Sequence, residues 1–198
     1  MVAPERPLGR KAYFKIAHLP GSRTGSSDRT APLELAERCL VAPRPGEEVL
    51  VQEKLDGSCV AVARLGDAVL ALGREGTLAA HSGNPGRQMF AAWVEQRAGV
   101  FRELLDDGEW LVGEWLALAH STRYELRHEP FVVFDAFHDG RQWTFDELDG
   151  RLQGAPPRCK SAGRVVGMAK YVRGDKVDGA LLPENSGRDA VWNWKPKP

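Results

Sequence analysis

The chain has 198 residues, with 27 basic and 27 acidic side chains, so its formal net charge at pH 7 is zero. This balance excludes a uniformly basic nucleic-acid coat but permits a local basic groove. No apolar run approaches the length of about 18 residues that a membrane span needs, and the N-terminus lacks the apolar core of a signal peptide. The three cysteines lack metal-ligand spacing. We therefore expect a protein of the reducing cytoplasm with no membrane partner.

The first 40 residues are expected to hold one short helix. Residues 1–11 are predicted to be frayed. Pro20–Pro32 is a polar loop that contains Arg23 and Arg29. Its composition is typical of a linker, but the two arginines and the backbone amides also suit a loop that meets phosphates. The helix is predicted over Leu33–Leu40.

Three β segments are expected over Glu47–Leu72. Leu65-Gly66-Asp67 has the composition of a hairpin turn, and it joins Ser58–Arg64 to Ala68–Leu72. Asn84-Pro85 then resembles a helix cap followed by a first-turn proline. Apolar residues recur after it at helical spacing up to Gly108, and we expect their aromatic rings in the core. Further strands are predicted over Glu109–Leu118, Phe131–Phe137, Gln142–Phe145 and Arg164–Val172. Many strands with few helices indicate an α+β fold with antiparallel sheets.

A lysine stands between two apolar alternating runs, in Glu53-Lys54-Leu55-Asp56-Gly57. The glycine lets backbone and ligand approach closely. The amine of Lys54 is a nucleophile if burial or nearby cations depress its pKa. Lys176-Val177-Asp178-Gly179 repeats the pattern, but too few residues follow it to complete a nucleotide pocket. The sequence therefore favours Lys54 over Lys176 as the nucleophile.

Three later residues fit the other tasks of a nucleotide pocket. Glu114, in a Gly-Glu-Trp segment, could accept hydrogen bonds from ribose hydroxyls. Phe134 offers an aromatic face for a purine, and Arg74 could meet a phosphate or the 5′ side of the ribose. Taken singly, each has a plain structural explanation: Glu114 as a surface residue of a strand, Phe134 as core and Arg74 as a solvated turn residue.

In this order, the motifs resemble those of the ATP-dependent RNA ligases, in particular the nick-sealing branch, within the superfamily of covalent nucleotidyltransferases. The matching segments are Glu53–Gly57, Leu72–Gly76, Leu111–Leu116 with Ala119–Tyr124, and Phe131–Asp135. The resemblance implies an α+β nucleotidyltransferase domain of the ligase type, with two packed antiparallel sheets and flanking helices (ATP-grasp-like). The nucleotide-binding residues that it implies are Glu53, Lys54, Asp56, Gly57, Arg74, Glu114, Phe134 and Lys170.

The resemblance also implies a reaction in three steps. Lys54 attacks ATP and releases pyrophosphate, which leaves lysyl-AMP. AMP then passes to the 5′-phosphate of an RNA, and a 3′-hydroxyl displaces AMP and seals the strand, as in RNA repair. Mg²⁺ or Mn²⁺ should assist by neutralising phosphate charge.

The later motifs of the family match less well. The Glu-Gly motif whose carboxylate helps to hold the metal is absent after Phe134, and Asp178 is the nearest substitute. The second phosphate-contacting lysine has two candidates. Lys195 precedes Pro196 close to the end of the chain, whereas Lys170 lies in an apolar run where an unpaired charge would be costly. We favour Lys170, which implies that the metal motif is lost, because Asp178 comes after it.

We expect residues 1–198 to form a single nucleotidyltransferase domain without an appended OB or C-terminal domain. RNA contact then falls to the core, the Pro20–Pro32 loop or a partner. The leading hypothesis is an ATP-dependent RNA ligase. The alternatives are a DNA ligase, a capping-type guanylyltransferase, and a degenerate module that binds or accepts a nucleotide without sealing. The missing Glu-Gly motif is the main support for the last of these.

Overall fold

The computed structural model describes residues 5–22, 25–26, 28–40, 49–52, 55–118, 124, 126, 129–152 and 161–165. The chain divides into two compact units. The first contains Met1–Phe14 and Asp56–Arg158, and the second contains Lys15–Leu55 and Cys159–Pro198. The single domain expected from the sequence stays a prediction. None of the helices in the described ranges is long and apolar enough to cross a membrane.

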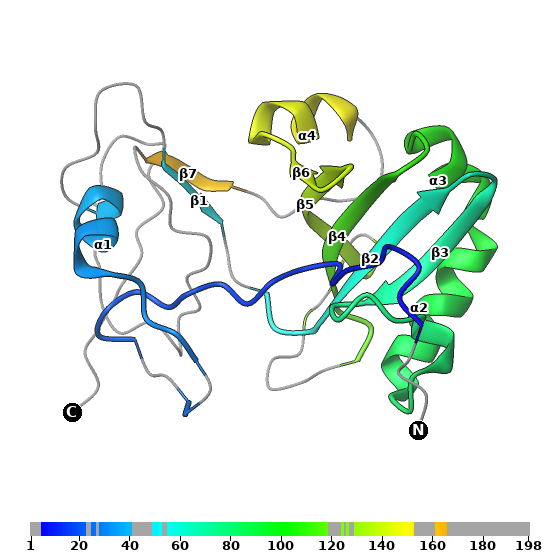
Figure 1. Cartoon of the computed structure of the whole chain (residues 1–198), viewed down its shortest axis with the longest axis horizontal. Coiled ribbons are helices and arrows are strands. Elements are labelled where there is room, and N and C mark those ends of the chain that lie inside the picture. The colour runs from blue at the N-terminus through cyan, green and yellow to red at the C-terminus, as the bar shows by residue number, and fades with distance from the viewer. Residues whose placement is uncertain are drawn as a thin grey trace. The chain divides into compact units, whose positions relative to one another are not determined.

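The first unit is built on a five-stranded sheet with the strand order β3-β2-β4-β5-β6 (Figure 1). Each pair of neighbouring strands is antiparallel. The strands are β2 (Ser58–Leu65), β3 (Ala68–Gly73), β4 (Glu109–Trp115), β5 (Phe131–His138) and β6 (Arg141–Gln142). The α+β class with antiparallel sheets, expected from the sequence, is confirmed.

The β2–β3 hairpin forms where the sequence predicts it. Leu65 pairs with Ala68, and Gly66 takes a positive φ of 58°, which a glycine adopts without steric cost. The Gly66 amide donates a 2.6 Å hydrogen bond to Asp107 Oδ1. The turn is therefore fixed both by its own conformation and by the segment that follows the helices.

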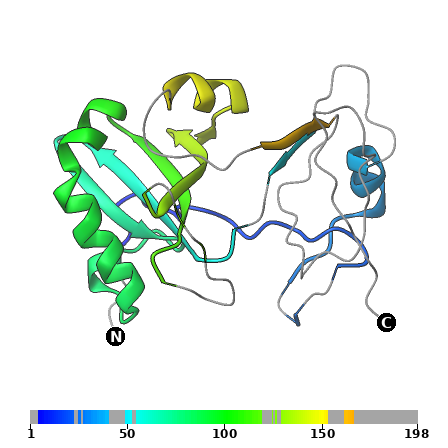
Figure 2. The ribbon, with the colours of Figure 1, turned by 180° about the vertical axis from the view of Figure 1, so that it is seen from behind.

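Two helices, α2 (Pro85–Gln96) and α3 (Ala98–Leu104), cover one face of this sheet, and the N-terminal segment crosses the opposite face (Figures 1 and 2). Asn84 caps α2 as predicted: its side chain accepts a hydrogen bond from the Arg87 amide, and Pro85 takes the first turn. The helical spacing of the sequence is divided between two helices, because α2 ends before Arg97 and α3 begins after it.

The core lies between these helices and the sheet. An aromatic cluster occupies its centre, with ring centroids between 5.2 and 6.4 Å apart. Its members are Phe90, Trp93, Phe101, Trp115 and Phe131. Edge-to-face and tilted pairs of this kind stabilise a core beyond their buried area. Phe90 and Phe101 of the two helices are core residues, as the sequence predicts, and Trp93 is partly buried against them.

The end of this unit differs from the sequence prediction. A strand is expected over Gln142–Phe145, but β6 stops at Gln142 and a helix, α4 (Phe145–Arg151), follows. Thr144 caps α4 by accepting from the Glu147 amide, and Glu147 Oε2 accepts from the Thr144 amide at 2.6 Å. This reciprocal pair is a capping box, which begins a helix because it satisfies two unpaired amides at once.

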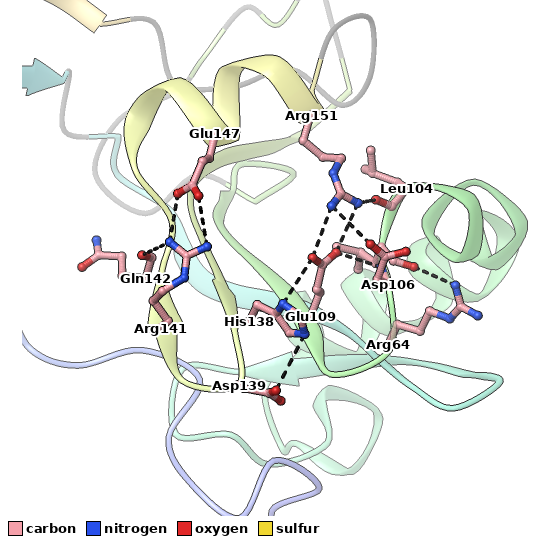
Figure 3. A network of polar contacts seen from close by, with 11 residues as sticks. Arg64, Leu104, Asp106, Glu109, His138, Asp139, Arg141, Gln142, Glu147 and Arg151 are labelled. Atoms are coloured by element: carbon pink, nitrogen blue, oxygen red, sulfur yellow. Dashed lines mark hydrogen bonds and ion pairs between the residues drawn. The ribbon is translucent and has the colours of Figure 1, made fainter.

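Glu109 fastens α4 to the sheet (Figure 3). Only 3% of this β4 residue is exposed. Its carboxylate accepts hydrogen bonds from both terminal nitrogens of Arg151 at 3.3 Å and from the Asp106 amide at 2.8 Å. His138 of β5 stands 3.9 Å away. A buried carboxylate requires such partners, so Glu109 connects α4, β4 and the end of α3.

The stability of α4 should depend on pH through Glu147. Two parallel hydrogen bonds of 3.0 Å from Arg141, together with the cap at Thr144, lower the pKa of Glu147 from 4.5 to about 2. Because the folded-state pKa is depressed, the stabilisation is complete above about pH 4.5 and is lost as the pH falls through about 2. Glu147→Gln should therefore lower the Tm at pH 7, and the difference from wild type should shrink between pH 4.5 and 2.

Thermal unfolding followed by circular dichroism at several pH values checks this. The exposed Glu103 on α3 supplies the control, because Glu103→Gln should leave the Tm nearly unchanged at every pH. A difference between the Glu147→Gln variant and wild type that stays constant down to pH 2 would contradict the prediction.

The second unit contains α1 (Leu33–Leu40) and a two-stranded antiparallel sheet of β1 (Val49–Gln52) and β7 (Ser161–Val165). The helix has the bounds predicted from the sequence. His18 closes the base of the polar loop, because its amide donates to Arg29 O and its carbonyl accepts from the Ala31 amide, both at 2.7 Å. The packing of two sheets onto each other, and the binding of phosphate by this loop, stay predictions.

Candidate active site

Five of the expected nucleotide-binding residues lie in the first unit: Asp56, Gly57, Arg74, Glu114 and Phe134. The others lie outside the described residues, namely Glu53, Lys54 and Lys170, together with the candidate metal ligand Asp178. The geometry of the site is therefore built from the turn that follows the lysine and from the residues around it.

Glu114 brings the predicted ribose-binding motif to the lysine motif. It lies one residue before the end of β4, where it pairs in register with Cys59 of β2. Its Oε1 accepts a 2.9 Å hydrogen bond from the amide of Gly57. Only 9% of Glu114 is exposed, which excludes the explanation of an ordinary surface residue. A buried carboxylate with this partner is a fixed acceptor at the end of the sheet.

Gly57 lies so close to β4 that no larger residue fits. A Cβ at this position would overlap the carbonyl oxygen of Trp115, and it would lie 2.9 Å from Leu116 Cδ2. The structure shows a close approach of Gly57 to the backbone of β4, whereas the approach of a ligand to this glycine, expected from the sequence, stays a prediction. It serves the packing of the turn against β4.

A further residue of the site, Tyr124, was not singled out by the sequence reasoning. Its hydroxyl accepts a 2.7 Å hydrogen bond from the Asp56 amide. The residue closes the segment Ala119–Tyr124, which matches the loop after the glutamate motif. That match was the available signal, but a contact across 68 positions of the chain cannot be read from local pattern.

Arg74 follows the last residue of β3 in a tight turn. The Gly73 amide donates to Thr77 O, and the Gly76 amide donates to Gly73 O, both at 2.8 Å. Gly76 has a φ of 83°, and a Cβ there would overlap the backbone of Arg10. The turn therefore holds the backbone of Arg74 in one place next to the N-terminal segment.

The N-terminal segment covers this turn. The Tyr13 amide donates to Arg74 O at 3.1 Å, and Lys11 forms an ion pair with Glu75. The hydrogen bond from Lys11 lowers the pKa of Glu75, and the charges of Lys11 and Arg74 lower it further. Residues 1–11 were predicted to be frayed. This prediction is wrong for Lys11, because its ion pair with Glu75 holds it against the turn.

The guanidinium of Arg74 lies 3.6 Å from Glu75, with 34% of its side chain exposed. A partly exposed guanidinium on a fixed backbone is suited to meet a phosphate.

A β-bulge in β5 sets the position of Phe134. Gly113 pairs with Val133 and Val112 pairs with Asp135, so Phe134 is the extra residue between them. Before the bulge, Glu114 pairs with Val132, and alternation places Phe134 on the same face as Glu114. That is the face away from α2 and α3, where the N-terminal segment lies.

Phe134 is 6% exposed, and its ring packs edge-on against Tyr13 at 5.2 Å. The burial of Phe134 is therefore that of a core residue, as the structural explanation expects. The β-bulge determines on which face of the sheet its side chain lies. Three residues expected in the site, Glu114, Arg74 and Phe134, thus lie in the same unit, and their roles toward a nucleotide stay predictions.

Within the described ranges, no three His, Cys, Asp or Glu side chains come together as a group that could hold a metal ion. Asp178 lies outside those ranges. The metal site expected from the sequence stays a prediction, and no step of the chemistry is assigned to a metal-holding residue of this chain.

The family model for RNA ligase matches residues 47–180, which is more than half of the 198 residues. The chain belongs to the RNA ligase family. The resemblance read from its motifs is thereby confirmed at the level of the family, and the match spans every nucleotide-binding residue expected from the sequence. A search among curated proteins found no significant match.

Solved RNA ligases have a similar structure. A Naegleria gruberi RNA ligase with PPi is 16% identical, with a TM-score of 0.54 over 90% of this chain and 54% of that chain. An archaeal ATP-dependent RNA ligase is 24% identical, with a TM-score of 0.48 over 64% of this chain and 35% of that one. A variant of the Naegleria enzyme with ATP and Mn is 18% identical, with a TM-score of 0.45 over 75% of this chain and 44% of that one.

The Naegleria comparison shows the fold of the RNA ligase family in this chain. The chain spans about half of the length of the first of these relatives and about a third of the second. Its activity, substrates and partners are therefore proposals.

Proposed function

We propose that the chain acts as an ATP-dependent RNA ligase that carries AMP on Lys54. The observation that supports this best is the 2.9 Å hydrogen bond between Glu114 and the Gly57 amide. It joins two motifs of the family that lie 57 residues apart in the sequence. A ribose-binding carboxylate and the turn of the nucleophilic lysine must be neighbours if one nucleotide is to meet both.

Covalent geometry limits where Lys54 can lie. Three residues of fully extended chain span at most about 11 Å, so the Cα of Lys54 lies within about 11 Å of the Cα of Gly57. The lysine is thereby confined to the neighbourhood of the amide that Glu114 holds.

The reaction that we propose needs three displacements at phosphorus. The neutral amine of Lys54 bonds to the α-phosphorus of ATP, loses a proton, and pyrophosphate leaves. The 5′-phosphate of an RNA then attacks lysyl-AMP and releases the lysine, which gives a 5′-to-5′ pyrophosphate linkage. A 3′-hydroxyl attacks the RNA phosphorus, the phosphodiester forms, and AMP leaves. Arg74 neutralises phosphate charge, and Mg²⁺ or Mn²⁺ supplies further neutralisation.

Phe134 should contribute more to nucleotide use than Phe137 does. Both rings are buried and both pack against Tyr13, so the two alanine variants remove similar packing. Stacking of a base on an aromatic ring is worth about 1–3 kcal/mol. We therefore expect Phe134→Ala to raise the ATP concentration for half-maximal labelling roughly 5- to 150-fold, measured against Phe137→Ala. Equal shifts in the two variants would contradict a stacking role.

One labelling experiment tests the proposed function. The chain is incubated with labelled ATP or labelled GTP in the presence of Mg²⁺ or Mn²⁺, and the labelled protein is then chased with nicked RNA or nicked DNA. Label from ATP that nicked RNA removes with sealing is the expected result. Label from GTP indicates the capping-type alternative, and sealing of DNA alone indicates a DNA ligase.

A self-adenylylating module without sealing activity is the second candidate. The absence of a Glu-Gly motif after Phe134 in the sequence favours it. This candidate predicts a labelled band that neither nicked RNA nor nicked DNA removes.

A further inference from the structure

Two neighbouring backbone amides, those of Asp56 and Gly57, are held by side chains from a single later segment of the chain. Gly57 donates to Glu114 Oε1 at 2.9 Å, and Asp56 donates to Tyr124 Oη at 2.7 Å. Both residues precede Ser58, the first residue of β2. Side chains therefore hold both amides of this pair, which we call the lysine turn because it follows Lys54 in the sequence.

The segment that carries Tyr124 is tied at its base. The Leu116 amide donates to Pro130 O at 2.8 Å. Glu129 accepts hydrogen bonds from Trp93 Nε1 at 2.9 Å and from Arg97 at 2.8 Å. These bonds, that from Trp93 first, lower the pKa of Glu129, so the carboxylate stays ionised at neutral pH. Leu116 and Pro130 are thus joined, and Glu129 is held against Trp93 and Arg97, which limits the path of the chain between these ends.

The type of acceptor at Asp56 matters because Lys54 stands only two residues earlier in the sequence. A carboxylate at this place would favour the protonated form of a nearby amine and raise its pKa. Attack on ATP requires the neutral amine. A tyrosine hydroxyl accepts the amide hydrogen without adding charge near neutral pH. The Asp56 amide is therefore held by an uncharged group, so this hydrogen bond adds no further carboxylate to those of Asp56 and Glu114.

We propose that Tyr124 is a positioning residue for nucleotidyl transfer: its hydroxyl fixes the Asp56 amide and thereby the direction in which the chain presents Lys54. The inference rests on the proposed function. Lys54 lies two residues from Asp56, at most about 7 Å along an extended chain. Rotation of the Asp56 peptide would therefore change the direction in which the chain leads back to Lys54. The hydroxyl passes no proton to or from the reacting groups in this role.

The test is Tyr124→Phe in the full chain, which removes one oxygen atom and keeps the ring. Single-turnover labelling with ATP and Mn²⁺ should show a rate constant about 10-fold lower, the scale of one lost hydrogen bond. The ATP concentration for half-maximal rate should change less than about 2-fold, because a positioning residue acts on the step after binding. The midpoint of the pH–rate profile should not move. A moved midpoint would show that the hydroxyl takes part in proton transfer and would overturn the proposal.

Glu147→Gln is the control for a purely structural effect, because it should lower stability without touching the lysine turn. It should label at the wild-type rate. If Tyr124→Phe also labels at the wild-type rate while Lys54→Ala does not label, Tyr124 has no positioning role. If the wild-type chain takes no label, the proposed function fails. This outcome differs from a failure of the Tyr124 proposal, in which the wild-type chain is labelled.

Amide exchange gives a second readout that does not depend on activity. The Asp56 amide should exchange about 10-fold faster in Tyr124→Phe, and the Gly57 amide, held by Glu114, should change less. Equal exchange of the Asp56 amide in both proteins would show that the hydroxyl does not hold the turn, and it would overturn the inference whatever the activity of the chain.

Discussion

Lys54→Ala is expected to abolish the transfer of label from ATP to the protein. The reason is chemical: no other group of the motif can form a phosphoramidate, since alanine has no amine and the remaining carboxylates are poor acceptors of the adenylyl group. The measurement is the labelled band after incubation with α-labelled ATP and Mn²⁺ or Mg²⁺. Treatment of the band with hydroxylamine or with acid then identifies the bond, because a phosphoramidate and an acyl phosphate differ in how easily each reagent cleaves them.

The chain offers a matched control in Lys176, which stands in the same four-residue pattern, Lys-Val-Asp-Gly. Lys176→Ala should leave a labelled band close to that of the wild type. If the Lys54→Ala chain takes label and the Lys176→Ala chain does not, Lys176 rather than Lys54 is the nucleophile. Lys176 lies within the segment matched by the family model, so the model alone does not separate the two lysines and the pair of variants is needed.

The parts of the fold that the sequence predicted are those fixed by neighbours in the chain. The β2–β3 hairpin follows from a turn at Gly66 between alternating strands, and the start of α2 follows from the Asn84 cap with Pro85 behind it. Each signal acts within a few residues, so it does not depend on the tertiary contacts made by the rest of the chain. The helix α4 carried such a signal too, Thr144 with Glu147 three residues later, but the strand assigned over Gln142–Phe145 concealed it.

The bulge in β5 could not be predicted from the sequence. Almost every residue of Phe131–Phe137 is apolar, so no alternation marks the position where one residue is added. The structure shows the shift between Val112 and Gly113 in the pairing with β4. Both faces of β5 are covered, one by helices and one by the N-terminal segment. An apolar residue is thus accepted on either face, and only the pairing partner fixes which face Phe134 takes.

Of the candidate site, the sequence named the residues but not their contacts. Glu114 was expected from its motif, yet its acceptor role toward the Gly57 amide depends on the register between β2 and β4. Tyr124 needed the same register and a loop closed at Pro130. Contacts of this kind join distant parts of the chain, and a single sequence contains no pattern that reports them.

Gly57→Ala should reduce labelling from ATP by about 100-fold, the scale expected when a reacting group is displaced by about 1 Å. The added Cβ would overlap the carbonyl oxygen of Trp115, which is held in β4 and cannot withdraw. The lysine turn must move instead, and the hydrogen bond from the Gly57 amide to Glu114 must lengthen or break. The variant should also unfold at a lower temperature, because a buried carboxylate then loses a partner.

Gly99→Ala in α3 is the matched control for this change. A Cβ at Gly99 would meet no atom within 4 Å, and alanine is favoured over glycine inside a helix by about 0.5–1 kcal/mol. This variant should unfold at the same or a slightly higher temperature and label at the wild-type rate. Single-turnover labelling at a temperature well below both transitions separates the effect on the site from the effect on folding. If Gly57→Ala is folded there and labels as fast as Gly99→Ala, the turn at Gly57 does not position the lysine, and the close approach to Trp115 serves packing alone.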